Sequence, residues 1–87
     1  MITLTIYSRP GCHLCDEMKA VVHRTLQRAR VAVCIEEVDI SNNPDLEARY
    51  GIEIPVLLVD GKKAAKYRLT ESELTRMLSA RGSGSSA

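Results

Sequence analysis

The chain passes directly from a strand pattern into a helix pattern near its start, and two cysteines stand at the junction. Ile2 to Tyr7 alternates apolar and polar residues, which is typical of a strand with one buried face. Pro10-Gly11 ends this pattern, and from Leu14 onward apolar residues recur every three or four positions, as on one face of a helix. Cys12 and Cys15 therefore span the first turn of the predicted helix. Residues three apart at a helix start have Cα atoms roughly 5 to 6 Å from each other, the separation that a disulfide prefers. The junction predicts a redox-active pair.

Composition narrows the classes of partner. At 87 residues the chain has room for one domain with one hydrophobic core. Its 12 Lys and Arg against 11 Asp and Glu leave a net charge of +1, and Trp and Phe are absent. Nucleic acids and anionic membranes need a concentrated basic face, so the composition favours neither partner. No apolar run approaches the ~20 residues of a membrane span, and the first residues lack the features of a signal peptide.

The cysteine count indicates a reducing compartment. A small secreted domain usually carries an even set of cysteines, whereas this chain has 3. We therefore expect a cytoplasmic protein. Cys34 is left over, and we expect it to be buried as a small hydrophobic residue. A closed zinc site needs four ligands, and only Cys34, His13 and His23 are available beside the pair, so we expect no metal site.

The middle of the chain predicts a second strand and a short helix. Val31 to Ile35, extended by Val38, is rich in β-branched residues. A strand, a helix and a strand in this order form a right-handed unit, so the two strands should be parallel. The short helix begins at Asn43-Pro44, where asparagine caps the first turn and proline suits it. It ends at Gly51, a typical residue just past a helix C-terminus.

The C-terminal half predicts a hairpin and a last helix. Strands over Ile54 to Val59 and Lys62 to Tyr67 enclose the two-residue turn Asp60-Gly61. Thr70 and Glu73 have the spacing of a capping box, which starts the last helix. That helix should end near Arg81-Gly82, which divides the chain into a domain over residues 1–81 and a disordered tail over residues 82–87.

The element order and the cysteine motif together resemble the glutaredoxin and thioredoxin superfamily, and most closely the short glutaredoxin-like proteins of bacteria. The segment from Ile6 to Cys15, the dipeptide Ile54-Pro55 and the turn Asp60-Gly61 carry the resemblance, which extends over residues 2–81. It implies an α/β thioredoxin fold of minimal size, β-α-β-α-β-β-α, with a mixed four-stranded sheet and helices on both faces. It also implies that the peptide bond before Pro55 is cis and faces the cysteines.

The chemistry gives each candidate residue a role. Cys12 lies at the helix N-terminus, where the thiolate is favoured, so it should attack, and the more buried Cys15 should resolve the mixed disulfide. His13 is a candidate modulator of the Cys12 pKa. The main chain of Ile54, exposed by Pro55, is expected to pair with an extended substrate as an added strand does.

The resemblance is incomplete where glutathione should bind. Arg9 matches the basic residue of glutaredoxins near the cysteines and is a candidate substrate-binding residue. His13-Leu14 stands where those proteins usually have Pro-Tyr, and Tyr67 to Glu71 replaces their Gly-Gly pair and acidic residue. We therefore expect no bound cofactor. The usual glutathione pocket is incomplete here, and glutathione is expected at most to serve as a reductant.

The sequence thus predicts a monomeric thiol–disulfide oxidoreductase in cell redox homeostasis, using Cys12 and Cys15 on a protein disulfide or with an upstream thiol reductant. Two other hypotheses stay open. One is a binding module of the same fold that uses the Ile54-Pro55 groove with little turnover. The other, favoured less, is an iron–sulfur or metal carrier.

Overall fold

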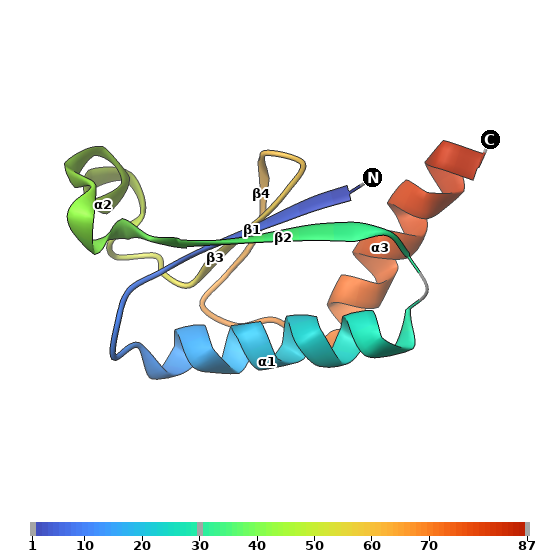
Figure 1. Ribbon diagram of the computed structural model, residues 1–87, viewed down its shortest axis with the longest axis horizontal. Coiled ribbons are helices and arrows are strands. Elements are labelled where there is room, and N and C mark those ends of the chain that lie inside the picture. Colours follow the sequence, from blue (N-terminus) through green and yellow to red (C-terminus); the bar gives the residue numbers. More distant parts are fainter. Residues whose placement is uncertain (1, 30, 87) are drawn as a thin grey trace.

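The computed structural model of the protein describes residues 2–29 and 31–86, with side chains described as far as residue 80 (Figure 1). The predicted β-α-β-α-β-β-α order is confirmed, with one short 3-10 turn, η1, added before the second helix. The elements are β1 (Ile2–Ser8), α1 (His13–Arg28), β2 (Val33–Asp39), η1 (Ile40–Asn42), α2 (Pro44–Tyr50), β3 (Val56–Val59), β4 (Lys62–Lys66) and α3 (Glu71–Ser86).

The four strands form one mixed sheet in the order β2-β1-β3-β4. The β1–β2 pair is parallel, and the β1–β3 and β3–β4 pairs are antiparallel. In Figure 1, α1 and the beginning of α3 lie along one face, and α2 lies at one end of the sheet on the side away from α1. This is the predicted α/β thioredoxin fold.

The core fills the space between the sheet and the two longer helices. Alternate residues of β1 point into it, and Leu4 and Ile6 are completely buried. β3 is buried at every position, and α1 and α3 each contribute the apolar stripe that the sequence predicted. The main buried members from the helices are Met18, Val22, Leu74 and Leu78.

The prediction that Cys34 is buried is wrong. Cys34 is exposed, because β2 is an edge strand and Cys34 pairs with Thr3 on the face of the sheet away from α1. Its neighbours Val33 and Ile35 point toward the core and are partly buried. A β-branched run therefore marked the strand correctly, but not which of its two faces is covered.

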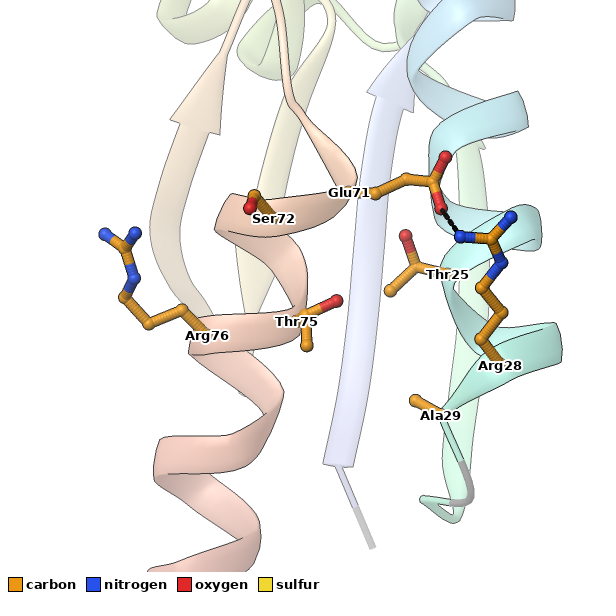
Figure 2. Close-up of a pocket in the computed structure, with 7 residues that line it drawn as sticks. All are labelled: Thr25, Arg28, Ala29, Glu71, Ser72, Thr75 and Arg76. Atoms are coloured by element: carbon orange, nitrogen blue, oxygen red, sulfur yellow. Dashed lines mark ion pairs between the residues drawn. The ribbon is translucent and has the colours of Figure 1, made fainter.

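The start of α3 is fixed by hydrogen bonds and by ion pairs to α1. Thr70 Oγ1 accepts from the Glu73 N–H at 3.1 Å, and the Glu73 carboxylate accepts from the Thr70 N–H at 3.0 Å, so the predicted capping box is confirmed. Glu71 bridges to α1 through Arg24 at 3.2 Å and Arg28 at 3.6 Å. Figure 2 shows the second of these pairs across a hollow between the two helices.

The end of α3 differs from the prediction. The helix continues to Ser86, past the expected end at Arg81-Gly82. No proline follows to stop the helix, and glycine or serine in a helix costs only up to about 1 kcal/mol each. Ala87 and the side chains of residues 81–86 lie outside the described part, so the separate tail over residues 82–87 stays a prediction.

Gly51, at the end of α2, has a different role from the one predicted. Its backbone is right-handed helical, with φ −52° and ψ −35°, so a left-handed turn does not explain the glycine. A Cβ at this position would lie 2.5 Å from the Glu47 carbonyl oxygen and 3.2 Å from Nη2 of Arg9. Glycine is required here because the chain and the Arg9 side chain approach closely.

Glu53, two residues before Pro55, ties this segment to the hairpin. Its carboxylate lies 2.7 Å from Nζ of Lys63 and 3.5 Å from Nζ of Lys66. The hydrogen bond from Lys63 lowers the pKa of Glu53, and the same contact raises the pKa of Lys63. Lys63 and Lys66 of β4 therefore hold the segment before Pro55.

We predict that Gly51→Ala lowers the free energy of unfolding by about 1 to 3 kcal/mol, the usual cost of forcing extra volume into a packed site. Urea unfolding should show a lower midpoint with an unchanged slope. Ala48→Ser, at an exposed position of α2, should change stability by less than about 0.5 kcal/mol. Equal midpoints for the two variants would show that the close contact at Gly51 is not limiting.

We also predict a pH-dependent contribution from Glu53. Because its pKa is lowered in the folded protein, its stabilising effect is complete above the ordinary carboxyl pKa and is lost as the pH falls through the lowered value. Glu53→Gln should therefore be less stable than the unsubstituted protein at pH 7 and equal to it in acid. In NMR titrations Lys63→Met should raise the Glu53 pKa, whereas the neighbouring Lys62→Met should not. Equal effects of the two lysine variants would contradict a specific pair.

Candidate active site

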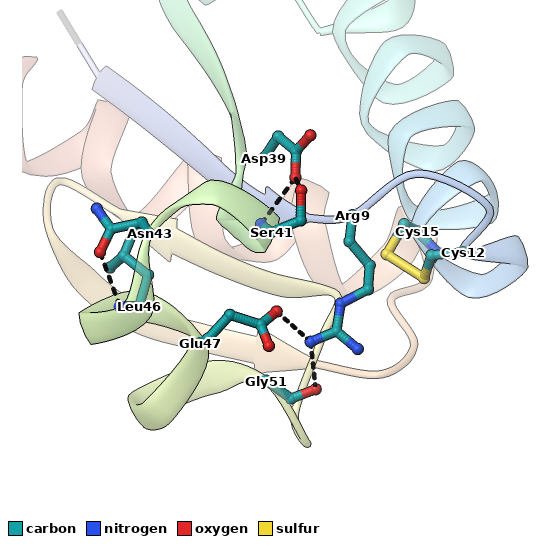
Figure 3. Close-up of polar contacts among 9 residues, drawn as sticks. All are labelled: Arg9, Cys12, Cys15, Asp39, Ser41, Asn43, Leu46, Glu47 and Gly51. Carbon is teal, nitrogen blue, oxygen red and sulfur yellow. Dashed lines mark hydrogen bonds and ion pairs between the residues drawn. A yellow bond between two sulfur atoms is a disulfide. The ribbon is translucent and has the colours of Figure 1, made fainter.

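The two cysteines of the motif are joined as a disulfide at the start of α1 (Figure 3). Their Cα atoms are 5.2 Å apart, within the range predicted from the helix start. Cys12 is the N-cap residue of α1, and its sulfur accepts a hydrogen bond from the Cys15 N–H at 3.1 Å. The main chain therefore presents a donor to the Cys12 sulfur, and the positive end of the helix dipole points toward it.

The two sulfurs differ in accessibility. Cys15 is completely buried, whereas Cys12 is half-buried. Gly11, directly before the pair, has φ +78°, a conformation that glycine adopts without steric cost and that turns the loop into the helix. The inside and outside positions expected for Cys15 and Cys12 are the ones observed.

His13 projects into solvent rather than onto the disulfide. Its side chain is 89% exposed, and Nε2 lies 3.7 Å from the Glu17 carboxylate one turn along α1. When His13 is protonated, Glu17 offsets part of its charge. His13 therefore follows Cys12 in the sequence, but its side chain faces the Glu17 carboxylate rather than the disulfide.

The turn between β2 and α2 positions α2, the helix that contacts the loop before the cysteines. Asp39 caps η1, where its carboxylate accepts from the Ser41 N–H at 2.8 Å and from the Ser41 hydroxyl at 2.6 Å. These hydrogen bonds lower the pKa of Asp39. Asn43 then caps α2 through the Leu46 N–H, as the sequence predicted (Figure 3). The ring of Tyr50 packs on the ring of Tyr7 in β1, with 4.8 Å between the ring centroids. This contact holds α2 against the end of the sheet.

Arg9 connects the cysteine loop to α2. Its guanidinium pairs with the Glu47 carboxylate and donates to the Gly51 carbonyl oxygen at 3.5 Å (Figure 3). The Arg9 and Glu47 side chains remain 37% and 38% exposed. Sequence reasoning anticipated a basic residue near the cysteines but missed its partner, because Glu47 is 38 residues away in the chain.

The Ile54-Pro55 segment lies beside the cysteine loop. Tyr7 pairs with Val56 in the sheet, so the residues just before β3 are neighbours of the residues just after β1. The Ile54–Pro55 peptide bond is cis, as the resemblance implied. In the part of the chain that the structure describes, no turn, loop or side-chain hydrogen bond engages the Ile54 main chain.

Tyr67 is a site residue whose role the sequence did not reveal. It has φ +67° and is 43% exposed. Its N–H donates to the Pro55 carbonyl oxygen at 2.8 Å, and its hydroxyl donates to the Ile52 carbonyl oxygen at 3.2 Å. The only signal in the sequence was its place after the hairpin strand, where the chain must turn toward the cap of α3.

The described residues contain neither a metal-binding cluster nor a membrane-spanning helix. No group of three or more His, Cys, Asp or Glu side chains there is arranged to hold a metal ion. None of the helices described combines the length and the apolar character that crossing a bilayer requires.

Comparison with known proteins identifies the family of the chain. The family model of the glutaredoxin-like domain (DUF836) matches residues 3–79. The glutaredoxin-like protein YDR286C homolog of Dictyostelium discoideum is 30% identical over 77 residues, which make up 84% of this chain and 71% of that protein.

Solved structures of other proteins have the same fold. Protein Ne2328 from Nitrosomonas europaea is 29% identical, with a TM-score of 0.74 over 88% of this chain and 91% of that chain. The structural genomics target XcR50 from X. campestris is 31% identical, with a TM-score of 0.67 over 88% of this chain and 96% of that chain. Chloroplastic thioredoxin z, at 13% identity and a TM-score of 0.76 over 95% of this chain and 80% of that one, shares the fold. The chain belongs to the glutaredoxin-like domain family, within the thioredoxin superfamily.

Proposed function

We propose that the protein is a small dithiol thiol–disulfide oxidoreductase in which Cys12 attacks the substrate and Cys15 resolves. The observation that carries this proposal is the pair itself, a half-buried Cys12 bonded to a completely buried Cys15 at the start of a helix. Only the outer cysteine is accessible to another molecule, while the inner one is within bonding distance of it. The arrangement suits one thiol that meets the substrate and a second that completes the exchange.

In the reductive direction the reaction starts from the reduced pair. The Cys12 thiolate attacks one sulfur of the substrate disulfide, and the other substrate sulfur leaves as a thiolate and takes a proton from water. Cys15 then loses its proton to water and attacks the Cys12 sulfur, which releases the second substrate thiolate to be protonated in turn. The substrate gains two electrons and two protons, and the protein is left with the Cys12–Cys15 disulfide. An external thiol or dithiol reductant restores the reduced pair.

The main chain around the pair supports a reactive Cys12. A thiolate at the N-cap accepts the Cys15 N–H and lies at the positive end of α1, so the pKa of the reduced Cys12 should be lower than that of a free cysteine. A lower pKa also makes Cys12 a better leaving group when another thiolate attacks the substrate sulfur of the mixed disulfide.

The substrate side of the site supports binding of an extended segment. The main chain of Ile54, held next to the cysteines by Pro55, is available to pair with a substrate strand. Arg9 stays partly exposed while it pairs with Glu47, so it can also meet a substrate carboxylate. We therefore assign Ile54, Pro55 and Arg9 to substrate binding.

Protein disulfides fit this site better than glutathione does. Tyr67 stands where glutaredoxins usually carry a Gly-Gly pair, and its side chain is anchored on Ile52. Arg68, which follows, has the wrong charge for the ammonium group of glutathione. We propose a monomeric enzyme that works in the cytoplasm on protein disulfides, with no bound cofactor and with glutathione limited to the part of a reductant.

We predict that Cys15→Ser accumulates a mixed disulfide at Cys12 with a protein substrate, because the resolving thiol is missing. Reduced Cys15→Ser protein, incubated with disulfide-containing protein and quenched with alkylating agent, should show the adduct by mass spectrometry. Because Cys34 is an exposed free thiol, both variants also carry Cys34→Ser, and in that background Cys12→Ser should show no adduct. Absence of any adduct at Cys12 would favour a binding module that uses the Ile54-Pro55 groove without turnover.

We also predict that His13→Ala raises the pKa of reduced Cys12 and that Glu17→Gln lowers it. The two side chains form an exposed pair on the first turns of α1, so each effect should be a fraction of a pKa unit. Ultraviolet absorbance of the thiolate, titrated in both variants, measures the two shifts. Unchanged titrations in both variants would remove His13 as a modulator.

A further inference from the structure

A pocket of about 180 Å³ lies between the first turns of α1 and the loop that precedes α3. Leu14 stands between the two cysteines and forms part of its lining, so the pocket begins at the turn that carries the disulfide. Three further lining side chains are apolar and are supplied by both sides of the pocket. They are Met18, Val21 and Leu69.

The size of the pocket fits one apolar side chain. An apolar cavity of ~150 Å³ holds a benzene molecule, so this pocket accepts an aromatic or branched aliphatic group. The larger hollow of about 550 Å³ between α1 and α3 is different in character, because arginine, threonine, serine and glutamate side chains line much of it (Figure 2). It also lies at the end of α1 that is far from Cys12.

Tyr67 joins the pocket to the strand edge at Pro55. It lines the pocket, while its N–H bonds to the Pro55 carbonyl oxygen and its hydroxyl bonds to the Ile52 carbonyl oxygen. A segment that paired with the Ile54 main chain and placed its cysteine at Cys12 would have the adjacent residue within reach of the pocket. The pocket is thus continuous with the substrate edge of the proposed function.

The rim of the pocket carries an unmatched positive charge. Arg68 and Glu17 both line it, and the Glu17 carboxylate lies 3.7 Å from Nε2 of His13, with which it pairs when that histidine is protonated. Among the side chains that the structure describes, Arg68 forms no ion pair, in contrast to Lys63 and Lys66 of the preceding strand. An acidic group on the occupant would complement it.

We propose that this pocket binds an apolar side chain next to the reacting cysteine of a protein substrate, and that Arg68 pairs with an acidic residue beside it. The inference rests on the proposed function and names its substrate class as protein segments with this pattern. Tyr67 is then a specificity-determining residue, since it forms one wall of the pocket.

The test is a competition between two peptides in the Cys15→Ser variant, which also carries Cys34→Ser so that the exposed third thiol does not react. Each peptide carries one cysteine as a mixed disulfide with the same aromatic thiol, and the two differ only in leucine or serine after the cysteine. The Cys12 thiolate bonds to the peptide sulfur, and the aromatic thiol leaves with the electron pair and is protonated by water. The leucine adduct should exceed the serine adduct by about tenfold, a typical discrimination by a small apolar pocket.

Two substitutions in the pocket should abolish this preference. Val21→Phe fills the space, and Tyr67→Gly removes one wall while placing glycine at a position of positive φ, where it is tolerated without strain. In both, made in the Cys15→Ser background, the ratio should fall toward one. Lys62→Ala, at an exposed position of β4 outside the pocket, should retain the tenfold ratio.

The charge is tested with a second peptide pair that carries glutamate or lysine beside the leucine. Glutamate should be preferred by about threefold, the range of an exposed ion pair, and Arg68→Glu should reverse the order. A preference that Arg68→Glu leaves unchanged removes Arg68 from the proposal.

The outcomes separate the two proposals. Equal leucine and serine adducts in the Cys15→Ser protein, or a preference unchanged by both Val21→Phe and Tyr67→Gly, overturn the pocket while the exchange reaction stands. No adduct with any peptide overturns the proposed function itself.

Discussion

The position of β1 inside the sheet determines where both halves of the site lie. β1 pairs with β2 on one side and with β3 on the other, and its C-terminal end leads straight into the loop that carries Cys12. The antiparallel pairing of Tyr7 with Val56 sets Pro55 beside that loop, although more than forty residues of chain separate them. A slip of one residue in this register would turn the alternating core residues of β1, Leu4 and Ile6, toward the opposite face. The hydrophobic core therefore fixes the geometry of the redox pair.

Beside the redox pair, polar contacts hold the segment from Gly51 to Pro55. Arg9 reaches the Gly51 carbonyl oxygen from the cysteine loop, Lys63 reaches Glu53 from the hairpin, and Tyr67 reaches Ile52 from the loop before α3. Each contact comes from a different part of the chain. Individually such exposed contacts add little stability, but together they restrict how the segment beside the disulfide can move.

The start of α1 influences the chemistry mainly by making Cys12 a better leaving group. If the pKa of Cys12 fell from ~8.5 to ~6.5, the thiolate fraction at pH 7 would rise from about 3% to about 75%. Intrinsic nucleophilicity would fall by roughly eightfold, so attack would gain only about threefold. The faster departure of Cys12 from its mixed disulfide with the substrate, and the greater stability of the reduced pair, are not offset in this way. A helix end supplies up to about 2 kcal/mol, so a shift of that size, about 2.7 kcal/mol, needs a further contribution. The candidates are Arg9, protonated His13 and the S–H group of Cys15.

Local patterns predicted the fold because each element carries its own signal. The alternation in β1, the cap at Asn43, the turn Asp60-Gly61 and the box Thr70–Glu73 all act over a few residues, and all were confirmed. The features that sequence missed depend on contacts between distant segments. Cys34 is exposed because β2 lies at the edge of the sheet. Arg9 pairs with Glu47, 38 residues away, and Tyr67 contacts Ile52 only after the hairpin has formed.

The central claim is that the two thiols of the reduced protein are unequal, with Cys12 outside and reactive and Cys15 inside. The most direct measurement is an NMR titration of the cysteine Cβ signals in the reduced, unsubstituted protein. The structure predicts that Cys12 titrates below the ~8.5 of a free cysteine and that the buried Cys15 titrates well above Cys12. Titration of both thiols near the free value, or a lower pKa for Cys15 than for Cys12, would contradict the account.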